Sequence, residues 1–380
     1  MAFARARGYT AWDKTSQGFR GIAFMAEGTK RVFYVKYLAH TIFADILATR
    51  SDVRLDKLEN DSADELAGPV LAGAHAFQIG SARDELARKY HADRDLLRRA
   101  QSLLIVSTHG AGYDTVNLES CTDAGVLVLN QAGGNKEAVA EHVLGMMLSL
   151  SKRIIEADRA TRRDANLNRN IFMGHDLTGQ TVGIVGLGNV GKRVAELCRG
   201  LFSMRVLSFD PYVSAEVMGK HGVEKVPLDR LMSESDFVSI NCPLTDESRG
   251  LIGAAQYALM KPNAYFITTA RGSIHDEAAL EAALSAKKIA GAGLDVWEKE
   301  PPPLDHPLLR FDNVMVSPHT AGVTHEARIN MGRIAAEQML AALDGKRVAR
   351  VLNPEVWPRY AARFKETFGV APEAPAVSGG

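Results

Sequence analysis

Three polar residues in the second half of the chain, Arg271, Glu300 and His319, each come shortly after a strand-like run. A guanidinium group can hold a carboxylate or a carbonyl oxygen through two parallel hydrogen bonds. An imidazole titrates near neutral pH, so it can give a proton to a carbonyl oxygen or take one from a hydroxyl group. A carboxylate beside that imidazole orients it and favours its protonated form. These side chains therefore suit the interconversion of a 2-hydroxy acid and a 2-keto acid.

A glycine-rich turn in the middle of the chain suits the redox cofactor that such a reaction needs. Gly186, Gly188 and Gly191 form a G-x-G-x-x-G run between an apolar strand-like run and a helical pattern. The glycines permit a tight turn, a close approach of backbone N–H groups to a pyrophosphate, and close packing of the helix on the strand. Asp210 ends the next apolar run, nineteen residues after Gly191. Its carboxylate can bind a ribose diol and repels a 2′-phosphate, which predicts NAD rather than NADP.

These side chains need a framework that brings distant parts of the chain together. Short apolar runs alternate with helical patterns, which is typical of parallel sheets covered by helices. In such sheets the carboxyl ends of the strands meet at one ligand-binding crevice. Strands are predicted at 31–35, 103–107, 126–129, 182–185, 206–209, 237–241, 264–269, 291–296 and 314–317, and helices at 137–155, 278–286 and 324–343. The predicted fold class is α/β, with two doubly wound α/β domains.

The order of these elements predicts that one domain is inserted into the other. A discontinuous substrate-binding domain is expected at 31–136 and, after a return helix, at 330–355. A Rossmann NAD-binding domain at 137–329 lies between its two parts. Residues 1–30 are aperiodic and are interpreted as a loose leader, and residues 356–380 as a disordered tail.

The composition argues against several classes of partner. Lys+Arg and Asp+Glu balance at 45 each, so no overall field attracts nucleic acid or an anionic membrane. No apolar stretch approaches the length of a transmembrane helix, and residues 1–30 lack the pattern of a secretory signal. Cys121, Cys198 and Cys242 form no C-x-x-C pair, which favours reduced thiols. We therefore expect a cytoplasmic protein with no nucleic-acid, membrane or metal partner.

Taken together, four motifs resemble those of the D-isomer-specific 2-hydroxyacid dehydrogenases. In chain order they are the glycine run, Thr-Thr-Ala-Arg-Gly at 268–272, Leu-Asp-Val-Trp-Glu-Lys-Glu-Pro at 294–301 and Ser-Pro-His-Thr-Ala-Gly at 317–322. The resemblance covers about residues 31–350. It implies that Arg271 binds the substrate and that Glu300 is the partner of the acid/base His319. It also implies that Asp295 contacts the nicotinamide amide.

The resemblance extends to a substrate loop in the first half of the chain. The run at 107–114, Ser-Thr-His-Gly-Ala-Gly-Tyr-Asp, is similar to the family's loop, in which backbone N–H groups hold the substrate carboxylate. Small residues let such a turn form an anion nest. The residues expected to bind the substrate are Thr108, His109, Gly110, Ala111, Gly112 and Arg271. Those expected to contact NAD are Gly186, Gly188, Asn189, Val190, Gly191, Asp210, Cys242, Pro243, Ala270, Asp295, His319 and Gly322.

The substrate stays open at this point. Phosphoglycerate dehydrogenases often carry an arginine where this chain has Thr108, although residues 168–174 resemble a segment of those enzymes. Phosphoglycerate and the hydroxypyruvate/glyoxylate class are therefore both candidates. Formate dehydrogenase is less compatible, because that branch has glutamine at the position of Glu300. An NAD-sensing corepressor is a non-catalytic alternative that shares the fold.

Members of the resembled family usually dimerise through the cofactor domain, which predicts a homodimer here. Residues 137–180 are the segment expected to form the interface. The apolar side chains expected to contribute are Leu144, Met146, Met147, Leu148 and Leu150.

Overall fold

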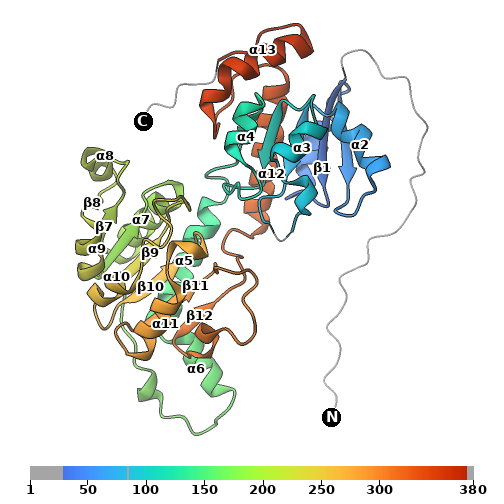
Figure 1. Ribbon diagram of the computed structural model, residues 1–380. Coiled ribbons are helices and arrows are strands. Elements are labelled where there is room, and N and C mark those ends of the chain that lie inside the picture. Colours follow the sequence, from blue (N-terminus) through green and yellow to red (C-terminus); the bar gives the residue numbers. More distant parts are fainter. Residues whose placement is uncertain (1–28, 84, 375–380) are drawn as a thin grey trace, which may run out of the picture.

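Two separate parallel sheets form the centres of two domains in the computed structural model, which describes residues 29–83 and 85–374 (Figure 1). The first sheet has five strands in the order β2-β1-β3-β4-β5, and its paired strands are parallel. The direction in which strands are added reverses between β1 and β3, which marks a ligand crevice in doubly wound folds. The strands are β1 (Lys30–Val35), β2 (Val53–Leu58), β3 (Ala76–Ile79), β4 (Ile105–Thr108) and β5 (Leu127–Leu129).

Each face of the first sheet is buried under its own set of helices. Val32 and Phe33 belong to different core clusters, because successive side chains of a strand point to opposite faces. On the side of Val32 lie α1 (Ile42–Leu47), α12 (His325–Leu343) and α13 (Trp357–Phe368). On the side of Phe33 lie α2 (Asp64–Gly73), α3 (Arg94–Arg99) and α4 (Leu118–Asp123). Short 3-10 turns are η1 (Arg88–Tyr90) and η5 (Pro354–Val356).

The second sheet has seven strands in the order β12-β11-β10-β9-β6-β7-β8, and its paired strands are also parallel. Here the direction of strand addition reverses between β6 and β9, so the segments that follow these two strands flank a crevice. The strands are β6 (Thr181–Val185), β7 (Arg205–Phe209), β8 (Glu224–Lys225), β9 (Phe237–Ile240), β10 (Tyr265–Thr268), β11 (Gly291–Leu294) and β12 (Val314–Val316).

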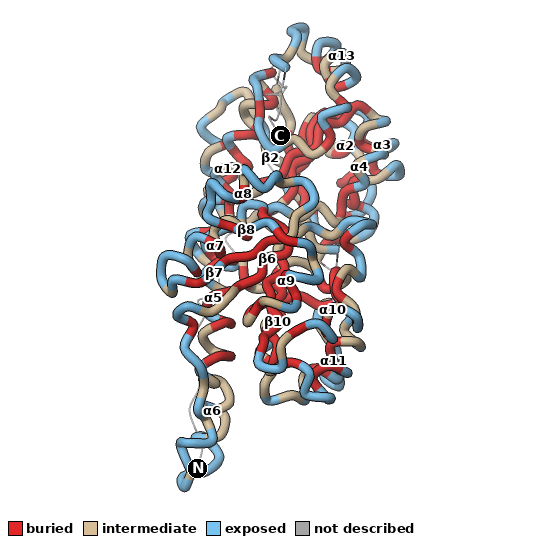
Figure 2. The backbone as a smooth tube through the Cα atoms, turned by 90° about the vertical axis from the view of Figure 1, so that its left-hand side faces the viewer, coloured by how far each residue is buried: buried red, intermediate tan, exposed pale blue. Residues whose placement is uncertain are grey.

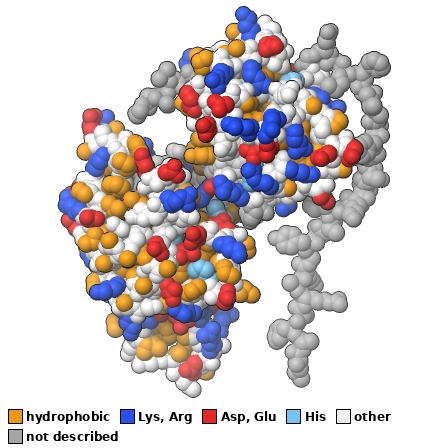
Figure 3. Space-filling view, viewed as in Figure 1, with side chains coloured by type: hydrophobic (Ala, Val, Ile, Leu, Met, Phe, Trp, Pro, Cys, Tyr) orange, Lys and Arg blue, Asp and Glu red, His pale blue; other side chains and the backbone are white. Residues whose placement is uncertain are grey.

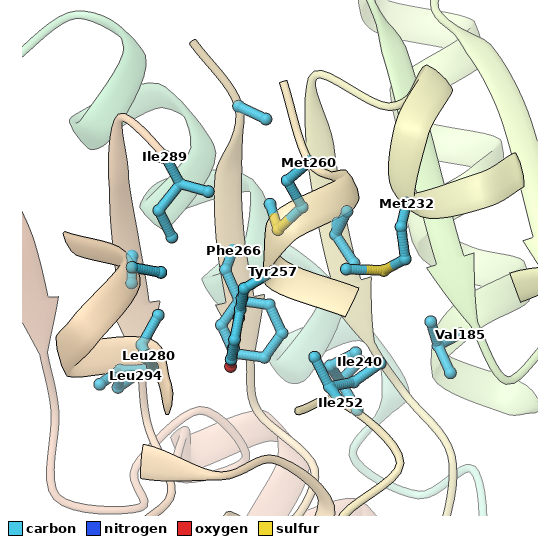
Figure 4. Packing of buried hydrophobic residues seen from close by; sticks show 14 of the residues in the cluster. Val185, Met232, Ile240, Ile252, Tyr257, Met260, Phe266, Leu280, Ile289 and Leu294 are labelled. Carbon is cyan, nitrogen blue, oxygen red and sulfur yellow. The ribbon is translucent and has the colours of Figure 1, made fainter. Parts of the chain in front are cut away.

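Helices cover both faces of the second sheet as well. Figure 4 shows one core, in which Ile240, Phe266 and Leu294 of the sheet pack against Tyr257 and Leu280 of the covering helices. That face carries α9 (Leu228–Glu234), α10 (Ala254–Leu259), α11 (Glu277–Ser285) and η4 (Pro307–Arg310). The opposite face carries α5 (Lys136–Ser151), α7 (Asn189–Phe202) and α8 (Ala215–Lys220). The remaining elements are α6 (Ile154–Thr161), η2 (Arg169–Phe172) and η3 (Gly272–Ile274).

Two helices join the domains. Helix α5 follows the first sheet in sequence but packs against α7, β10 and β11 of the second domain. Helix α12 follows the second sheet but packs against α1 and β4 of the first domain. The Thr324 side chain caps α12 by accepting a hydrogen bond from the Ala327 N–H at 3.1 Å. The predicted fold class is therefore confirmed, with the second domain inserted into the first, whereas the exact domain boundaries stay predictions.

The prediction of a disordered tail at 356–380 is wrong over residues 357–368, where helix α13 forms. Tyr360 and Phe364, spaced by one helical turn, are each 1% exposed and pack in the same core as Leu343 of α12. The Pro- and Ala-rich composition beyond this segment concealed that pair of aromatic anchors. Residues 375–380 of the tail and 1–28 of the leader lie outside the described residues.

Some local predictions were also incomplete. The helix expected at 137–155 is divided, because Arg153 adopts a left-handed backbone angle (φ 53°) between α5 and α6. Strand β2 was not predicted, because charged residues interrupt its apolar residues. Strand β3 was not predicted because it has only four residues. Among the helices of residues 29–83 and 85–374, none has both the length and the apolar character needed to cross a bilayer.

The apolar side chains expected at the dimer interface are buried within one chain. Leu144, Met146, Met147 and Leu150 are at most 7% exposed and fill the core between α5 and the second sheet, and Leu148 packs against the same cluster. The exposed apolar side chains of this region are instead Ile154, Ile171 and Met173, which are 50%, 54% and 77% exposed. Figure 2 shows α6 at the opposite end of the molecule from α13, beyond the buried centre of the second domain.

Candidate active site

A deep cleft lies between the two domains, and Figure 3 shows a notch there with basic, acidic and histidine side chains gathered at the junction. Its volume of about 680 Å³ is typical of a site for a small molecule. The predicted site residues that line it are His109, Gly110, Ala111, Gly112, Asn189, Val190, Cys242, Pro243, Ala270, Arg271, Asp295, Glu300, His319 and Gly322. The predicted site residues outside this lining are Thr108, Gly186, Gly188, Gly191 and Asp210.

His319 and Glu300 form a hydrogen-bonded pair in the cleft. They follow the neighbouring strands β12 and β11, which explains how residues so far apart in sequence meet. His319 Nδ1 lies 2.7 Å from Glu300 Oε2, and Glu300 Oε1 accepts a hydrogen bond from the Trp297 N–H at 3.1 Å. The hydrogen bond to Glu300 raises the pKa of His319 above its usual value, against the opposing effect of burial. The pair can therefore hold a proton at His319 and leaves Nε2 to exchange one with a ligand.

Asp295 holds the turn that carries His319. The Asp295 side chain is fully buried, and its carboxylate accepts hydrogen bonds from Ser317 Oγ (2.7 Å), Thr320 N (2.7 Å) and Ala321 N (2.9 Å). Its backbone oxygen accepts the His319 N–H at 2.7 Å. These bonds fix the left-handed backbone of His319 (φ 54°), which is uncommon for a residue other than glycine. The resemblance implies that Asp295 contacts the nicotinamide, and in this geometry its carboxylate is engaged by the turn that carries His319.

Arg271 links the two walls of the cleft. It follows β10, and its Nη2 lies 3.1 Å from Asp114 Oδ2 in the loop after β4, while Nη1 donates to the Ala270 carbonyl oxygen at 2.7 Å. A Cβ atom on Gly112 would lie 2.1 Å from Arg271 Nη2, so only glycine lets this loop approach the guanidinium so closely. Both partners of the ion pair are partly exposed. A substrate carboxylate can therefore replace Asp114 on the guanidinium.

The loop after β4 presents free backbone donors. The N–H groups of Ala111 and Gly112 have no hydrogen-bond acceptor among the described residues, whereas the Gly110 N–H donates to Gln131 Oε1 at 2.8 Å. Two such neighbouring donors beside Arg271 suit an anionic ligand. Thr108 is fully buried at the end of β4 and does not line the cleft.

The glycine turn after β6 has the geometry that a dinucleotide needs. Gly186 has a positive φ of 92°, and a Cβ atom there would lie 2.6 Å from the backbone nitrogen of Cys242, which follows the neighbouring strand β9. The turn leads directly into α7, with Gly188 at its N-cap. The first backbone N–H groups of this helix provide the positive end that a pyrophosphate prefers.

Asp210 is held beside the glycine turn. At the end of β7 its Oδ2 accepts a hydrogen bond from the Leu187 N–H of the glycine turn at 2.9 Å, and its Oδ1 accepts one from the Tyr212 N–H at 2.9 Å. The carboxylate therefore also stabilises the turn, a role that the sequence did not indicate.

Cys242 lines the cleft as a neutral thiol. Burial raises the pKa of Cys242 to about 11, so the thiolate is scarce at neutral pH. Across the described part of the chain, no group of three or more His, Cys, Asp or Glu side chains is arranged to hold a metal ion.

Sequence reasoning missed several residues of the first domain that line the cleft, chiefly Tyr37, Glu85, Asp114 and Arg328. Tyr37 follows β1, and its hydroxyl donates to Glu85 in the segment after β3. These segments follow the two strands at which the first sheet reverses direction. The end of the predicted strand at 31–35 was a usable signal for Tyr37, but without β3 the reversal could not be located.

With the fold and the cleft described, similarity to known proteins identifies the class. Residues 144–321 match the NAD binding domain of the D-isomer specific 2-hydroxyacid dehydrogenases. The chain is 38% identical over 316 residues to glyoxylate/hydroxypyruvate reductase B of Pectobacterium carotovorum, which covers 82% of this chain and 96% of that protein. The chain therefore belongs to the D-isomer specific 2-hydroxyacid dehydrogenase family, as an NAD-binding oxidoreductase.

Two further relatives allow the length and the fold of this chain to be compared with known proteins. The chain is 40% identical over 294 residues to D-3-phosphoglycerate dehydrogenase of Archaeoglobus fulgidus, but this covers 74% of the chain and only 55% of that protein. The crystal structure of D-lactate dehydrogenase from Aquifex aeolicus, complexed with NAD and lactic acid, matches with a TM-score of 0.69 at 26% identity. That match covers 83% of this chain and 96% of the other.

Proposed function

We propose that this protein reduces a short 2-keto acid to the D-2-hydroxy acid, and catalyses the reverse reaction, with NAD(H) as the redox partner. The observation that carries the proposal is the His319–Glu300 pair, which lines the same cleft as Arg271 and the open N–H groups of the loop after β4. NADH, when bound, supplies the hydride. The family membership supports the cofactor and the reaction class.

Each group on the protein has a distinct task in this proposal. Arg271 and the N–H groups of Ala111 and Gly112 bind the substrate carboxylate and orient the carbonyl group. Protonated His319 donates its Nε2 proton to the carbonyl oxygen as the hydride reaches the carbonyl carbon, so the product is a neutral hydroxyl group. Glu300 stabilises the imidazolium before transfer and orients the ring.

The glycine turn, the start of α7 and Asp210 would hold the dinucleotide. A Cβ atom on Gly186 would collide with Cys242, so this tight turn requires glycine, and the N–H groups at the start of α7 would bind the pyrophosphate. Asp210 would bind the adenosine ribose and disfavour a 2′-phosphate. NAD is accordingly the expected cofactor in preference to NADP.

The candidate substrates are the hydroxypyruvate/glyoxylate class and 3-phosphohydroxypyruvate, the oxidised form of 3-phosphoglycerate. Both classes are named among the relatives. A panel of glyoxylate, pyruvate, hydroxypyruvate and phosphohydroxypyruvate, each with NADH and followed by loss of nicotinamide absorbance, tests the proposal. Turnover of at least one acid is expected, with the D product wherever reduction makes carbon 2 a stereocentre. An NAD-binding protein that turns over none of them would instead be a non-catalytic member of the fold.

The assembly we propose is a homodimer formed through the segment that contains α6 and η2. Ile154, Ile171 and Met173 support this, since three exposed apolar side chains on one segment favour burial against a second copy. Sedimentation velocity at micromolar concentration is expected to show a dimer. The double variant Met173→Glu with Ile171→Glu is expected to shift the equilibrium toward monomer.

We also propose that the enzyme is located in the cytoplasm, which its three free cysteines support. Cell fractionation followed by immunoblotting tests this location.

A further inference from the structure

His109 is a half-buried side chain that lines the cleft, and the protein does not use the hydrogen-bonding capacity of its ring. Neither its Nδ1 nor its Nε2 has a hydrogen-bond partner among the described residues, and both nitrogens are buried. Leaving buried donors and acceptors unpaired costs stability, and folded proteins avoid it. Because the ring lines the cleft, a bound molecule can provide the missing partner.

The position of His109 relates it to one part of the substrate. It lies in the same loop as Ala111 and Gly112, whose N–H groups have no acceptor among the described residues and which line the cleft together with Arg271. A ligand carboxylate held there puts the remaining substituent of carbon 2, which is carbon 3 of the substrate, beside the neighbouring residues of the loop. His109 is the one polar side chain among loop residues 109–112.

The surroundings of His109 define what that substituent can be. Burial, and secondarily the positive charge of Arg328, lower the pKa of His109 to about 4, so the ring is neutral near pH 7. Tyr37 packs against the imidazole, with ring centroids 5.6 Å apart, and donates its hydroxyl hydrogen to Glu85. A neutral imidazole offers one donor and one acceptor. A hydroxyl group can pair with either ring nitrogen, as a donor or as an acceptor, whereas a methyl group can pair with neither.

We propose that His109 recognises a hydroxyl group on carbon 3 of the substrate, which makes the preferred substrate a 3-hydroxy-2-keto acid. Hydroxypyruvate is the shortest compound of this class, and pyruvate is its analogue without the hydroxyl group. This inference rests on the proposed function, and it assigns specificity rather than chemistry to His109.

The test compares kcat/KM for hydroxypyruvate and pyruvate, with NADH, in the wild type and in His109→Phe and His109→Asn. The wild type is expected to prefer hydroxypyruvate, and His109→Phe to lower that preference about tenfold, because a polar site discriminates against the analogue that leaves it unpaired. His109→Asn, which retains a donor and an acceptor, is expected to restore part of the preference. The Kd for NADH should not change in either variant.

A matched control separates recognition from packing. His91 is buried in the same domain, and its Nε2 lies 3.2 Å from the Leu86 carbonyl oxygen, outside the cleft lining. His91→Phe is expected to lower Tm and to leave the substrate preference unchanged. His109→Phe is expected to leave Tm unchanged or higher, since the substitution removes unpaired buried nitrogens.

Several outcomes overturn the inference. Wild-type protein that reduces 2-keto acids with equal kcat/KM for hydroxypyruvate and pyruvate overturns it, and so does a His109→Phe variant with unchanged preference. An effect of His109→Phe confined to phosphohydroxypyruvate overturns it in favour of an anionic substituent. These results leave the proposed function intact, whereas wild-type protein that reduces none of the acids overturns the proposed function as well.

Discussion

His319 and His109 line the same cleft from different domains, and their surroundings are opposite. In the second domain, His319 is hydrogen-bonded to Glu300 at 2.7 Å, and this contact raises its pKa. In the first domain, His109 has no partner for either ring nitrogen among the described residues, and burial lowers its pKa to about 4. The same side chain is therefore held ready to carry a proton in one domain and held neutral in the other.

The difference extends from the two histidines to the two walls of the cleft. On the second domain, the His319 turn is fixed by Asp295, and the Glu300 carboxylate is itself held by the Trp297 N–H. The first domain differs, because no described residue accepts a hydrogen bond from the N–H groups of Ala111 and Gly112. The ring nitrogens of His109 have no partner there either. Fixed hydrogen bonds preorganise polar groups, and polar groups that the protein leaves unpaired can pair with a ligand. The comparison teaches that the second wall is organised by the protein itself, whereas part of the first wall can be completed by a ligand.

The largest effect is expected at the proton-carrying histidine. His319→Asn removes the general acid, and asparagine tolerates the left-handed backbone that this position requires. We expect kcat for keto-acid reduction to fall roughly a hundredfold or more, with the Kd for NADH unchanged because the glycine turn is untouched. Stopped-flow turnover and fluorescence titration measure the two quantities. A variant that retains wild-type kcat would place the chemistry elsewhere and end the comparison between the walls.

Glu300→Gln tests the electrostatic half of the comparison with a smaller effect. The Glu300 carboxylate raises the pKa of His319, and reduction needs the protonated imidazole. Without the charge the pKa of His319 falls, so the active form is lost at a lower pH than in the wild type. We expect the alkaline limb of the pH–kcat profile for reduction to move downward, and kcat to fall less than in His319→Asn. An upward movement of that limb would contradict the assigned roles.

How much the sequence predicts differs between the two walls. The second wall is built from short motifs that each end a strand, so Arg271, Glu300 and His319 could be grouped before the structure was known. The first wall depends on β3, on the segment that carries Glu85, and on where the return helix α12 places Arg328. Those contacts arise from long-range topology and leave no local pattern. The C-terminal helix α13 was missed for a related reason, since its two buried aromatic residues gain meaning only against α12.

Asp210→Asn extends the test to the far end of the second wall, where the effect is smaller still. Asparagine keeps an oxygen that can accept the Leu187 N–H, so the glycine turn stays supported, but the negative charge is removed. We expect the ratio of kcat/KM with NADPH to that with NADH to rise about tenfold, which corresponds to relief of about 1.4 kcal/mol of repulsion. Asp210→Ala serves as the control, because it loses both the charge and the acceptor. Its Kd for NADH should be higher than that of Asp210→Asn. Preference for NADPH in the unaltered protein would contradict the role of this carboxylate.

The smallest effect is expected at Cys242. Its side chain lines the cleft on the second wall but is not part of the His319–Glu300 pair. Burial raises the pKa of Cys242 to about 11, and the thiolate, the reactive form, is therefore scarce at pH 7.5. Cys242→Ala should leave kcat within about twofold of the wild type, since neither a nucleophile nor a proton donor is lost. Cys198, where burial raises the pKa to about 12, is the matched control in α7 away from the cleft. Iodoacetamide is expected to alkylate both thiols slowly, and the rate at Cys242 should be no higher than the rate at Cys198. A large loss of kcat in Cys242→Ala would give this thiol a part in the chemistry, and the account of the second wall would have to include it.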